Sequence, residues 1–372
     1  MKVLNYTKAF IVRRIAIRRR RAVTEMFNRY FKKIKAANPN MVSKYPIPDE
    51  WREKWTFSND KPLALCWDVY SSFFDKPDTN IVPNNIARNY IEPILTPAEY
   101  QPFYNDKNSF GVIIPADVMP KTYLRSVKGI LYDGEYNPVS KENFNELFLE
   151  AERLIVKPSK DMGGHGVTLF AKRDDGGFYD KEGNKFSLEL LLAEYKQDFL
   201  VQECLKQSAY MSQFNPTSVN TIRIASYRDV HTGEIHILGA VLRIGGKGAF
   251  VDNACSGGSF VEVKEDGSLG KYVCTQYGQT NERHNGINFA TSTFIIPEYD
   301  KIKEFVKNIA KRLPHMSLFA NDVAIDENGN PKLIEINTTD FSYWFYQFNG
   351  KAAFGEYTDD LLEFCKGKLD RV

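Results

Sequence analysis

The chain has 372 residues, of which 43% are hydrophobic, 26% charged and 13% aromatic. This is the composition of an ordinary globular protein, and it excludes a disordered chain, a collagen-like repeat and a pure coiled coil. The formal net charge of +2 argues against an obligate nucleic-acid binder, but it conceals an asymmetry. Residues 1–35 contain twelve Lys and Arg and a single acid, Glu25, so the remainder of the chain is mildly acidic.

Residues 8–36 are predicted to form one helix, because apolar residues from Ile15 to Ile34 recur at helical spacing with cations between them. Asn38-Pro39 predicts its end. Two interpretations of this basic helix stay open. Either it packs on a domain and keeps a solvated basic face, or it makes peripheral contact with an anionic membrane surface.

The predicted secondary structure changes near residue 150. Residues 1–95 are predicted to be a basic helical extension with little chemistry of its own, whereas β-rich runs separated by turns follow from residue 150 onward. The predicted strands are 154–158, 167–171, 199–203, 219–227 and 235–244, with a final hairpin over 319–337. The predicted helices of this part are 187–196, 298–312 and 358–368. This order indicates an α+β fold with antiparallel sheets and helices on one side.

Cysteine usage and hydropathy favour the cytoplasm. The five cysteines are an odd number, are widely scattered and include no CxxC pair, which fits a reducing compartment and argues against a zinc site. No apolar run approaches the ~20 residues that a membrane span needs. We therefore expect a cytoplasmic protein, peripheral at the inner membrane face if the basic helix binds there.

The hairpin at 319–337 carries the most informative chemistry. If Asn328-Gly329 centres its turn, Asp322 faces Glu335, and Asn337 shares a face with Glu335 because the two are two positions apart. Opposed carboxylates otherwise repel each other. Three such oxygen ligands suit Mg²⁺, which takes one or two carboxylates together with substrate phosphates. A solvated sheet face with incidental acids is the alternative.

Lys157 ends an apolar strand just before a glycine-rich loop. A lysine in this place can meet a phosphate as a point charge, and glycines allow backbone N–H groups to approach phosphate oxygens. The loop residues concerned are Gly163, Gly164, His165 and Gly166. Their spacing fits neither a Rossmann nor a P-loop motif, and a plain hairpin turn is the alternative.

The order of these motifs resembles the ATP-grasp superfamily. The matching pieces are Lys157-Pro-Ser with the glycine-rich loop, Val201–Leu205, Asp322, and Glu335-Ile-Asn337. Three further stretches resemble its sugar-transfer-associated branch, namely Ser218–Ile224, Val251–Gly258 and Ile295–Tyr299. The resemblance covers roughly residues 105–345 and rests on the ordered set, since no single motif is decisive.

The resemblance implies ATP held between two α+β subdomains. The module would begin at 96–150, continue with a lid subdomain at 151–210 and end with a C-terminal subdomain at 211–372. Lys157 would contact the α- and β-phosphates under the glycine-rich loop. The two Mg²⁺ ions would be held by Asp322, Glu335 and Asn337. The adenine hinge would consist of Gln202, Glu203, Cys204 and Leu205.

Other site residues are expected less directly. Family members commonly have an earlier phosphate-binding lysine, for which Lys107 is the candidate. Arg223 and Arg243 are the two candidates for the arginine that stabilises the transferring phosphoryl group. Candidate substrate residues are Asn220, Thr221, Asp252, Asn253, Gly257, Gly258 and His284. For the loop at 252–258 a plain turn is the alternative, and for His284 a histidine without function.

The resemblance implies an ATP-dependent carboxylate–amine ligase. A substrate carboxylate would attack the γ-phosphate to give an acyl phosphate, and an amine would then displace phosphate to form an amide. The branch implies small-molecule substrates of cell-surface polysaccharide biosynthesis, such as an amino acid and a sugar or sugar-linked lipid. A kinase acting on a hydroxyl and a non-catalytic nucleotide-binding module stay open. The sequence names neither substrate and does not give the oligomeric state.

Overall fold

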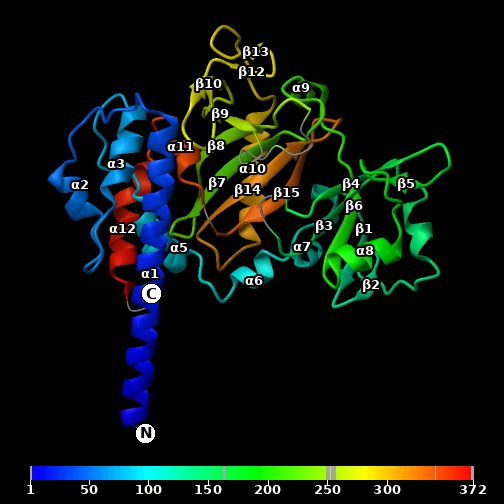
Figure 1. The fold of residues 1–372 in the computed structure, drawn as a ribbon, viewed down its shortest axis with the longest axis horizontal. Coiled ribbons are helices and arrows are strands. Elements are labelled where there is room, and N and C mark those ends of the chain that lie inside the picture. Colours follow the sequence, from blue (N-terminus) through cyan, green and yellow to red (C-terminus); the bar gives the residue numbers. More distant parts are fainter. Residues whose placement is uncertain (1, 162–164, 249–251, 253–256, 340, 370–372) are drawn as a thin grey trace.

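A computed structural model of the chain describes residues 2–161, 165–248, 252, 257–339 and 341–369, and within the first helix it describes side chains from Arg13 onward. A helical region, a large sheet and a smaller sheet follow one another across the molecule in Figure 1. Every described strand pair is antiparallel, and helices pack on both sheets. The expected α+β class is therefore confirmed.

The helical region joins the first helices of the chain to the last two. Its elements are α1 (Lys2–Ala37), α2 (Asp49–Lys54), α3 (Ala64–Tyr70), α4 (Asn84–Ile86), α5 (Glu92–Leu95), α11 (Trp344–Gln347) and α12 (Thr358–Lys366), with short irregular turns at 71–73, 87–91 and 355–357. One core unites them, in which Phe31, Trp67 and Leu361 are fully buried. The expected end of α1 before Asn38-Pro39 is confirmed.

The smaller sheet has the strand order β2-β1-β6-β3-β4-β5. Its strands are β1 (Thr122–Val127), β2 (Ile130–Tyr132), β3 (Arg153–Pro158), β4 (Thr168–Lys172), β5 (Phe178–Tyr179) and β6 (Phe199–Glu203). Helix α8 (Leu188–Tyr195) begins at the expected cap, where Ser187 accepts a hydrogen bond from the Leu190 N–H. It packs Leu191 onto Leu154 and Val156, so the opposite face of β3 is free to line a cleft.

The large sheet has the order β11-β10-β9-β8-β7-β14-β15. Its strands are β7 (Thr221–Arg228), β8 (Ile235–Ile244), β9 (Ser259–Val263), β10 (Leu269–Cys274), β11 (Thr280–Asn281), β14 (Leu318–Ile325) and β15 (Pro331–Asn337). Helix α10 (Tyr299–Lys311) covers one face through Ile302 and Val306, which pack with Ile222 and Ile224. The other face of β7 and β14 therefore carries the polar side chains.

Short elements connect these parts. They are α6 (Gln101–Tyr104), α7 (Lys107–Ile113), α9 (Ala209–Ser212), the two-stranded β12 (Arg283–His284) and β13 (Ile287–Asn288), and single helical turns at 116–118 and 144–148. Helix α7 contacts β1 and β6 of the smaller sheet. This contact places the start of α7 between the two sheets, beside the cleft. The domain boundaries at 95, 150 and 210 stay predictions.

The final hairpin has the predicted strand register in the half that lies away from its turn. Asp322 pairs with Glu335 and Ala320 with Asn337, as expected from an Asn-Gly-centred turn. Nearer the turn the register shifts by one, because Val323 pairs with Leu333 and leaves Ile334 as an extra residue. Such a bulge redirects a side chain at the point where it occurs. Here both Ile334 and Glu335 line the same pocket.

Candidate active site

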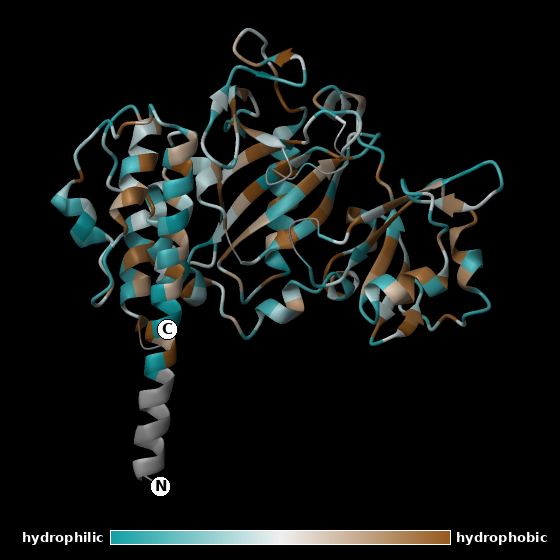
Figure 2. Ribbon diagram, in the orientation of Figure 1, coloured by the Kyte–Doolittle hydropathy of each residue, from teal (hydrophilic) through white to brown (hydrophobic). Residues whose placement is uncertain are grey.

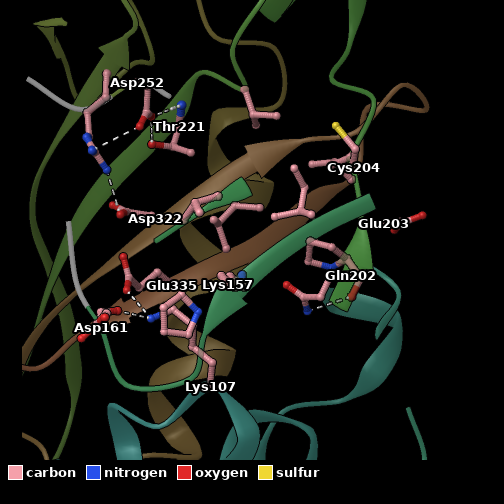
Figure 3. A pocket seen from close by; sticks show the side chains of 18 of the residues that line it. Lys107, Lys157, Asp161, Gln202, Glu203, Cys204, Thr221, Asp252, Asp322 and Glu335 are labelled. Atoms are coloured by element: carbon pink, nitrogen blue, oxygen red, sulfur yellow. Dashed lines mark hydrogen bonds and ion pairs between the residues drawn. The ribbon is translucent and has the colours of Figure 1, made fainter. Parts of the chain in front are cut away.

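A pocket lies between the two sheets and the start of α7 (Figure 3). The smaller sheet contributes side chains of β3 and β6, and the large sheet contributes those of β7, β8, β14 and β15. Strand alternation explains this selection, because Lys157 and Ile155 on β3 face away from the core residues Leu154 and Val156. The pocket is thus lined by one face of each sheet.

Two lysines lie on one side of the pocket. The Lys107 ammonium donates to the Asp161 carbonyl at 2.7 Å and pairs with the Glu335 carboxylate at 2.9 Å. Lys157 is half-buried, and its loss of hydration lowers its pKa to about 7, with the nearby Lys107 adding to the effect and Glu335 opposing it. An anion that enters the pocket would therefore stabilise the charged form of Lys157.

A third cation lies behind these lysines. Arg125 on β1 and Lys157 on β3 both pair with Leu200 of β6, so they stand on the same face of the sheet. Arg125 is only 2% exposed, its guanidinium donates to the Lys107 carbonyl at 3.2 Å, and it has no carboxylate partner among the ion pairs of the described residues. Arg125 does not line the pocket itself, but it adds a positive charge behind the two lysines that do.

The opposite end of this wall is apolar. The predicted hinge lines the pocket where β6 ends, through Gln202, Glu203, Cys204 and Leu205. Ile155, Val167, Val219 and Ile334 line the pocket as well. The side-chain amide of Gln202 already has a hydrogen-bond partner, because its Nε2 donates to the Thr122 hydroxyl at 2.9 Å. An apolar slot beside a strand end suits a flat base that is bound by backbone groups.

Asp322 lies on the large-sheet side, where two arginines bind its carboxylate. Arg223 donates to both of its oxygens, at 2.6 and 2.7 Å, and Arg243 donates to Oδ2 at 2.9 Å. Burial alone acts to raise the pKa of Asp322, but the two guanidinium groups outweigh it and lower the pKa to about 2. The carboxylate is therefore ionised at neutral pH.

Arg243 also binds a second carboxylate. Its Nη2 lies 3.2 Å from Asp252 Oδ1, and Asp252 accepts hydrogen bonds from the backbone N–H and the hydroxyl of Thr221. Burial raises the pKa of Asp252, and Arg243 opposes this effect. Hydrogen bonds and ion pairs thus connect five side chains along one side of the pocket, in the order Thr221, Asp252, Arg243, Asp322 and Arg223. Figure 3 labels Thr221, Asp252 and Asp322 of this network.

The structure places several other predicted residues outside the pocket lining. Asn220 faces away from it, because its amide donates to Gln207, Met211 and Asn215. His284 lies on β12 with Nε2 3.2 Å from the Gly245 carbonyl. Gly166, Gly257 and Gly258 do not line the pocket either, whereas His165 does. Gly163, Gly164 and Asn253 lie outside the described residues.

The aromatic cluster after the hairpin belongs to the core. Phe341, Tyr343, Phe345 and Tyr346 are all buried in the core of the helical region. The ring of Phe345 lies near the site, since the Arg223 guanidinium lies 5.5 Å from its centre. These four side chains therefore contribute to packing.

The acidic residues can accept a divalent cation only together with further oxygens. Asp322 and Glu335 supply carboxylate oxygens to the pocket from two adjacent strands. Asn337 does not line the pocket, and its Nδ2 donates to Asp322 Oδ2 at 3.4 Å. Among the described residues no three His, Cys, Asp or Glu side chains form a metal-binding group on their own. A site that is completed by phosphate oxygens is the usual Mg²⁺ arrangement, so these residues fit that ion.

Comparisons with known proteins agree with this geometry. A family model described as Sugar-transfer associated ATP-grasp matches residues 85–360, which confirms the resemblance and the ATP-grasp fold inferred from the motifs. A search of curated proteins finds no match to the chain.

Three solved structures are similar at low identity. The ATP-grasp ligase PsnB with its minimal precursor is 13% identical (TM-score 0.35), with 75% of this chain and 64% of PsnB covered. D-alanine–D-alanine ligase from Bacillus anthracis is 12% identical (TM-score 0.37), with 72% and 68% covered. L-amino acid ligase from Bacillus licheniformis is 13% identical (TM-score 0.36), with 70% and 48% covered. The chain thus spans less than two thirds of PsnB.

Proposed function

Because the chain belongs to the sugar-transfer associated ATP-grasp family, we propose that it is an ATP-dependent carboxylate–amine ligase. The observation that carries the proposal is the pocket between the sheets, where buried cations on one wall face Asp322 and Glu335 on the other. In the proposed reaction a carboxylate oxygen attacks the γ-phosphorus, the bond to the β-phosphate oxygen breaks, and ADP leaves. An amine then attacks the acyl carbon, phosphate leaves, and the nitrogen loses a proton.

The residues of this chain contribute charge and position rather than covalent chemistry. Lys157 and Lys107 would bind the phosphates, and the apolar slot at Gln202–Leu205 would bind the adenine. Asp322, Glu335 and Asn337 would hold Mg²⁺, which neutralises phosphate charge when bound. Arg223 and Arg243, already beside Asp322, would stabilise the transferring phosphoryl group.

The acceptor end of the pocket would lie near Arg243 and Asp252, opposite the hinge (Figure 3). An arginine there can bind a substrate carboxylate, and a buried aspartate can bind an amine or sugar hydroxyl. We propose on the family description that one substrate carries a sugar and serves in cell-surface polysaccharide biosynthesis. This step is an analogy at the level of the family.

The test is a screen for phosphate release, with amino acids crossed against uronic acids and amino-sugar nucleotides. A ligase releases phosphate only when carboxylate and amine are both present, and hydroxylamine traps its acyl phosphate in the absence of amine. Conversion of ATP to ADP with a phosphorylated product and no free phosphate would identify a kinase instead. Nucleotide binding without turnover across the whole screen would identify a non-catalytic module.

A further inference from the structure

Helix α1 has two halves that pack differently. In its second half Phe31 and Ile34 are fully buried, and Phe27 and Tyr30 pack against the same core. The first half extends beyond the other elements of the helical region in Figure 1. Of its described side chains, Ile15 is 60% exposed. Packing on the body therefore explains the second half of α1 and Arg20, which pairs with Asp60, but it does not explain the exposed Arg13, Arg18 and Arg19.

The projecting half is a dense cluster of positive charge. Residues 2–21 contain eight Lys or Arg and no acid. Arg13, Arg18, Arg19 and Arg21 are exposed, whereas Arg20 pairs with Asp60 at 3.2 Å. The remainder of the chain is acidic, yet it leaves most of these arginines to the solvent. Such a cluster favours an anionic partner.

Apolar residues are interleaved with these cations. In residues 2–21 they are Val3, Leu4, Phe10, Ile11, Val12, Ile15 and Ile17. No described helix is long and apolar enough to cross a membrane. A helix with apolar residues, Lys and Arg can lie in the plane of the membrane interface, where arginine stems follow the apolar layer and the guanidinium groups reach the headgroups. Figure 2 shows hydrophilic and hydrophobic residues mixed along the described part of α1.

Two other partners fit this segment less well. A second copy of the helix would bring like charges together, which opposes pairing through the projecting half. A nucleic acid would neutralise the arginines but would leave Ile15 and its apolar neighbours in water. We therefore propose that residues 2–21 bind the surface of a membrane that contains anionic phospholipids, with the arginines on headgroup phosphates and the apolar side chains at the acyl boundary.

The test uses the full chain and vesicles of phosphatidylcholine with or without phosphatidylglycerol, in a co-sedimentation assay at several salt concentrations. The variant is Arg18→Glu/Arg19→Glu/Arg21→Glu, which leaves Arg20 and its ion pair intact. The matched control is Lys32→Glu/Lys33→Glu/Lys35→Glu, the same charge change at exposed positions of the packed half. A second variant, Ile15→Asn, tests the apolar contribution.

The wild type is expected to bind the anionic vesicles and to lose binding as salt increases. Removing three cations lowers membrane affinity by about a hundredfold or more, since each contributes about fivefold near an anionic surface. The control is expected to stay within about threefold of wild type, and Ile15→Asn to bind more weakly than wild type. The proposal would be overturned by no vesicle binding of the wild type, by equal binding to pure phosphatidylcholine, or by binding to duplex DNA that vesicles do not compete away. Self-association that Ile15→Asn abolishes would overturn it in favour of a second copy.

Discussion

Asp322 and Glu335 lie directly opposite each other on β14 and β15, and each carboxylate binds its own cations. Asp322 binds Arg223 and Arg243, while Glu335 binds Lys107. The opposed acids are therefore neutralised separately, and they do not repel each other in the absence of a metal ion. In the proposed function Asp322 and Glu335 would hold Mg²⁺, and Lys107 and an arginine would bind the phosphates.

The first prediction concerns Glu335. Glu335→Gln removes one negative oxygen ligand and leaves Lys107 without its carboxylate, so we expect phosphate release to fall by about a hundredfold or more. The measurement is turnover with the substrate pair found in the screen, together with calorimetric binding of ATP with Mg²⁺. The matched control is Glu262→Gln, since Glu262 is also a strand residue that pairs with a lysine, Lys351, but outside the pocket. Activity of E335Q within a fewfold of wild type would refute the metal assignment.

The second prediction concerns the pH dependence of stability at Lys157. Its folded-state pKa of about 7 lies below the ordinary 10.5, so protonation opposes folding. Above pH 10.5 the lysine is neutral in both states and the penalty is absent. The penalty grows as the pH falls and is complete below about 7.

Lys157→Met is therefore expected to stabilise the nucleotide-free protein at pH 7, by about 4 kcal/mol at most, since one pKa unit corresponds to ~1.36 kcal/mol. The advantage is expected to shrink as the pH rises toward 10. The same variant is expected to lose ATP binding. Urea unfolding between pH 6 and 10 checks the first effect and calorimetry the second. A variant that is less stable than wild type at every pH would contradict the burial of this charge.

The third prediction separates the two arginines. Arg223 donates to both oxygens of the buried Asp322, so Arg223→Met leaves that charge with a single partner. We expect it to cost about 3–5 kcal/mol of stability. Arg243→Met keeps the bidentate pair and is expected to cost less stability. A folded R243M protein that binds ATP without turnover would indicate that Arg243 stabilises the transferring phosphoryl group. Normal turnover by R243M would indicate that Arg223 has this role instead.

The fourth prediction compares two buried asparagines. Asn321 on β14 is fully buried between Ile224 and Ile336, and neither atom of its amide group has a partner among the described residues. Asn321→Leu is therefore expected to raise the free energy of unfolding by about 1–3 kcal/mol. Asn220→Leu is expected to lower it, because the Asn220 side-chain nitrogen lies within hydrogen-bond distance of three acceptors that the variant would leave without this donor. Thermal unfolding of both variants tests the contrast, and destabilisation by both would contradict it.

Local chemistry in the sequence was enough to predict the hairpin that carries the acids. The Asn-Gly turn sets the pairing of Asp322 with Glu335, and alternation places Lys157 and Arg223 toward the cleft. The same alternation could have placed Asn220 on the face of Ile222, and it could have found Ile155 beside Lys157. The β9–β10 hairpin was not predicted, although Asp266-Gly267 marks its turn.

Other features depend on distant parts of the chain. The bulge at Ile334 shows no signal in the sequence, and it decides which side chains of β15 enter the pocket. The two arginines on Asp322 come from strands that lie far from it in sequence. Arg125 was not predicted as a residue of the site, because the sequence around it does not show that its guanidinium has no carboxylate partner. Such contacts depend on the packing of whole sheets.

The core of the helical region is made from the two ends of the described chain. Trp51, Trp55 and Trp67 are fully buried there together with Phe354 and Leu361. The early tryptophans therefore cannot complete their core before residues 354–361 have been synthesised. A shortened chain that starts at residue 85, where the family match begins, would leave the late helices without their partners. The family boundary is thus a poor place to cut this protein for expression.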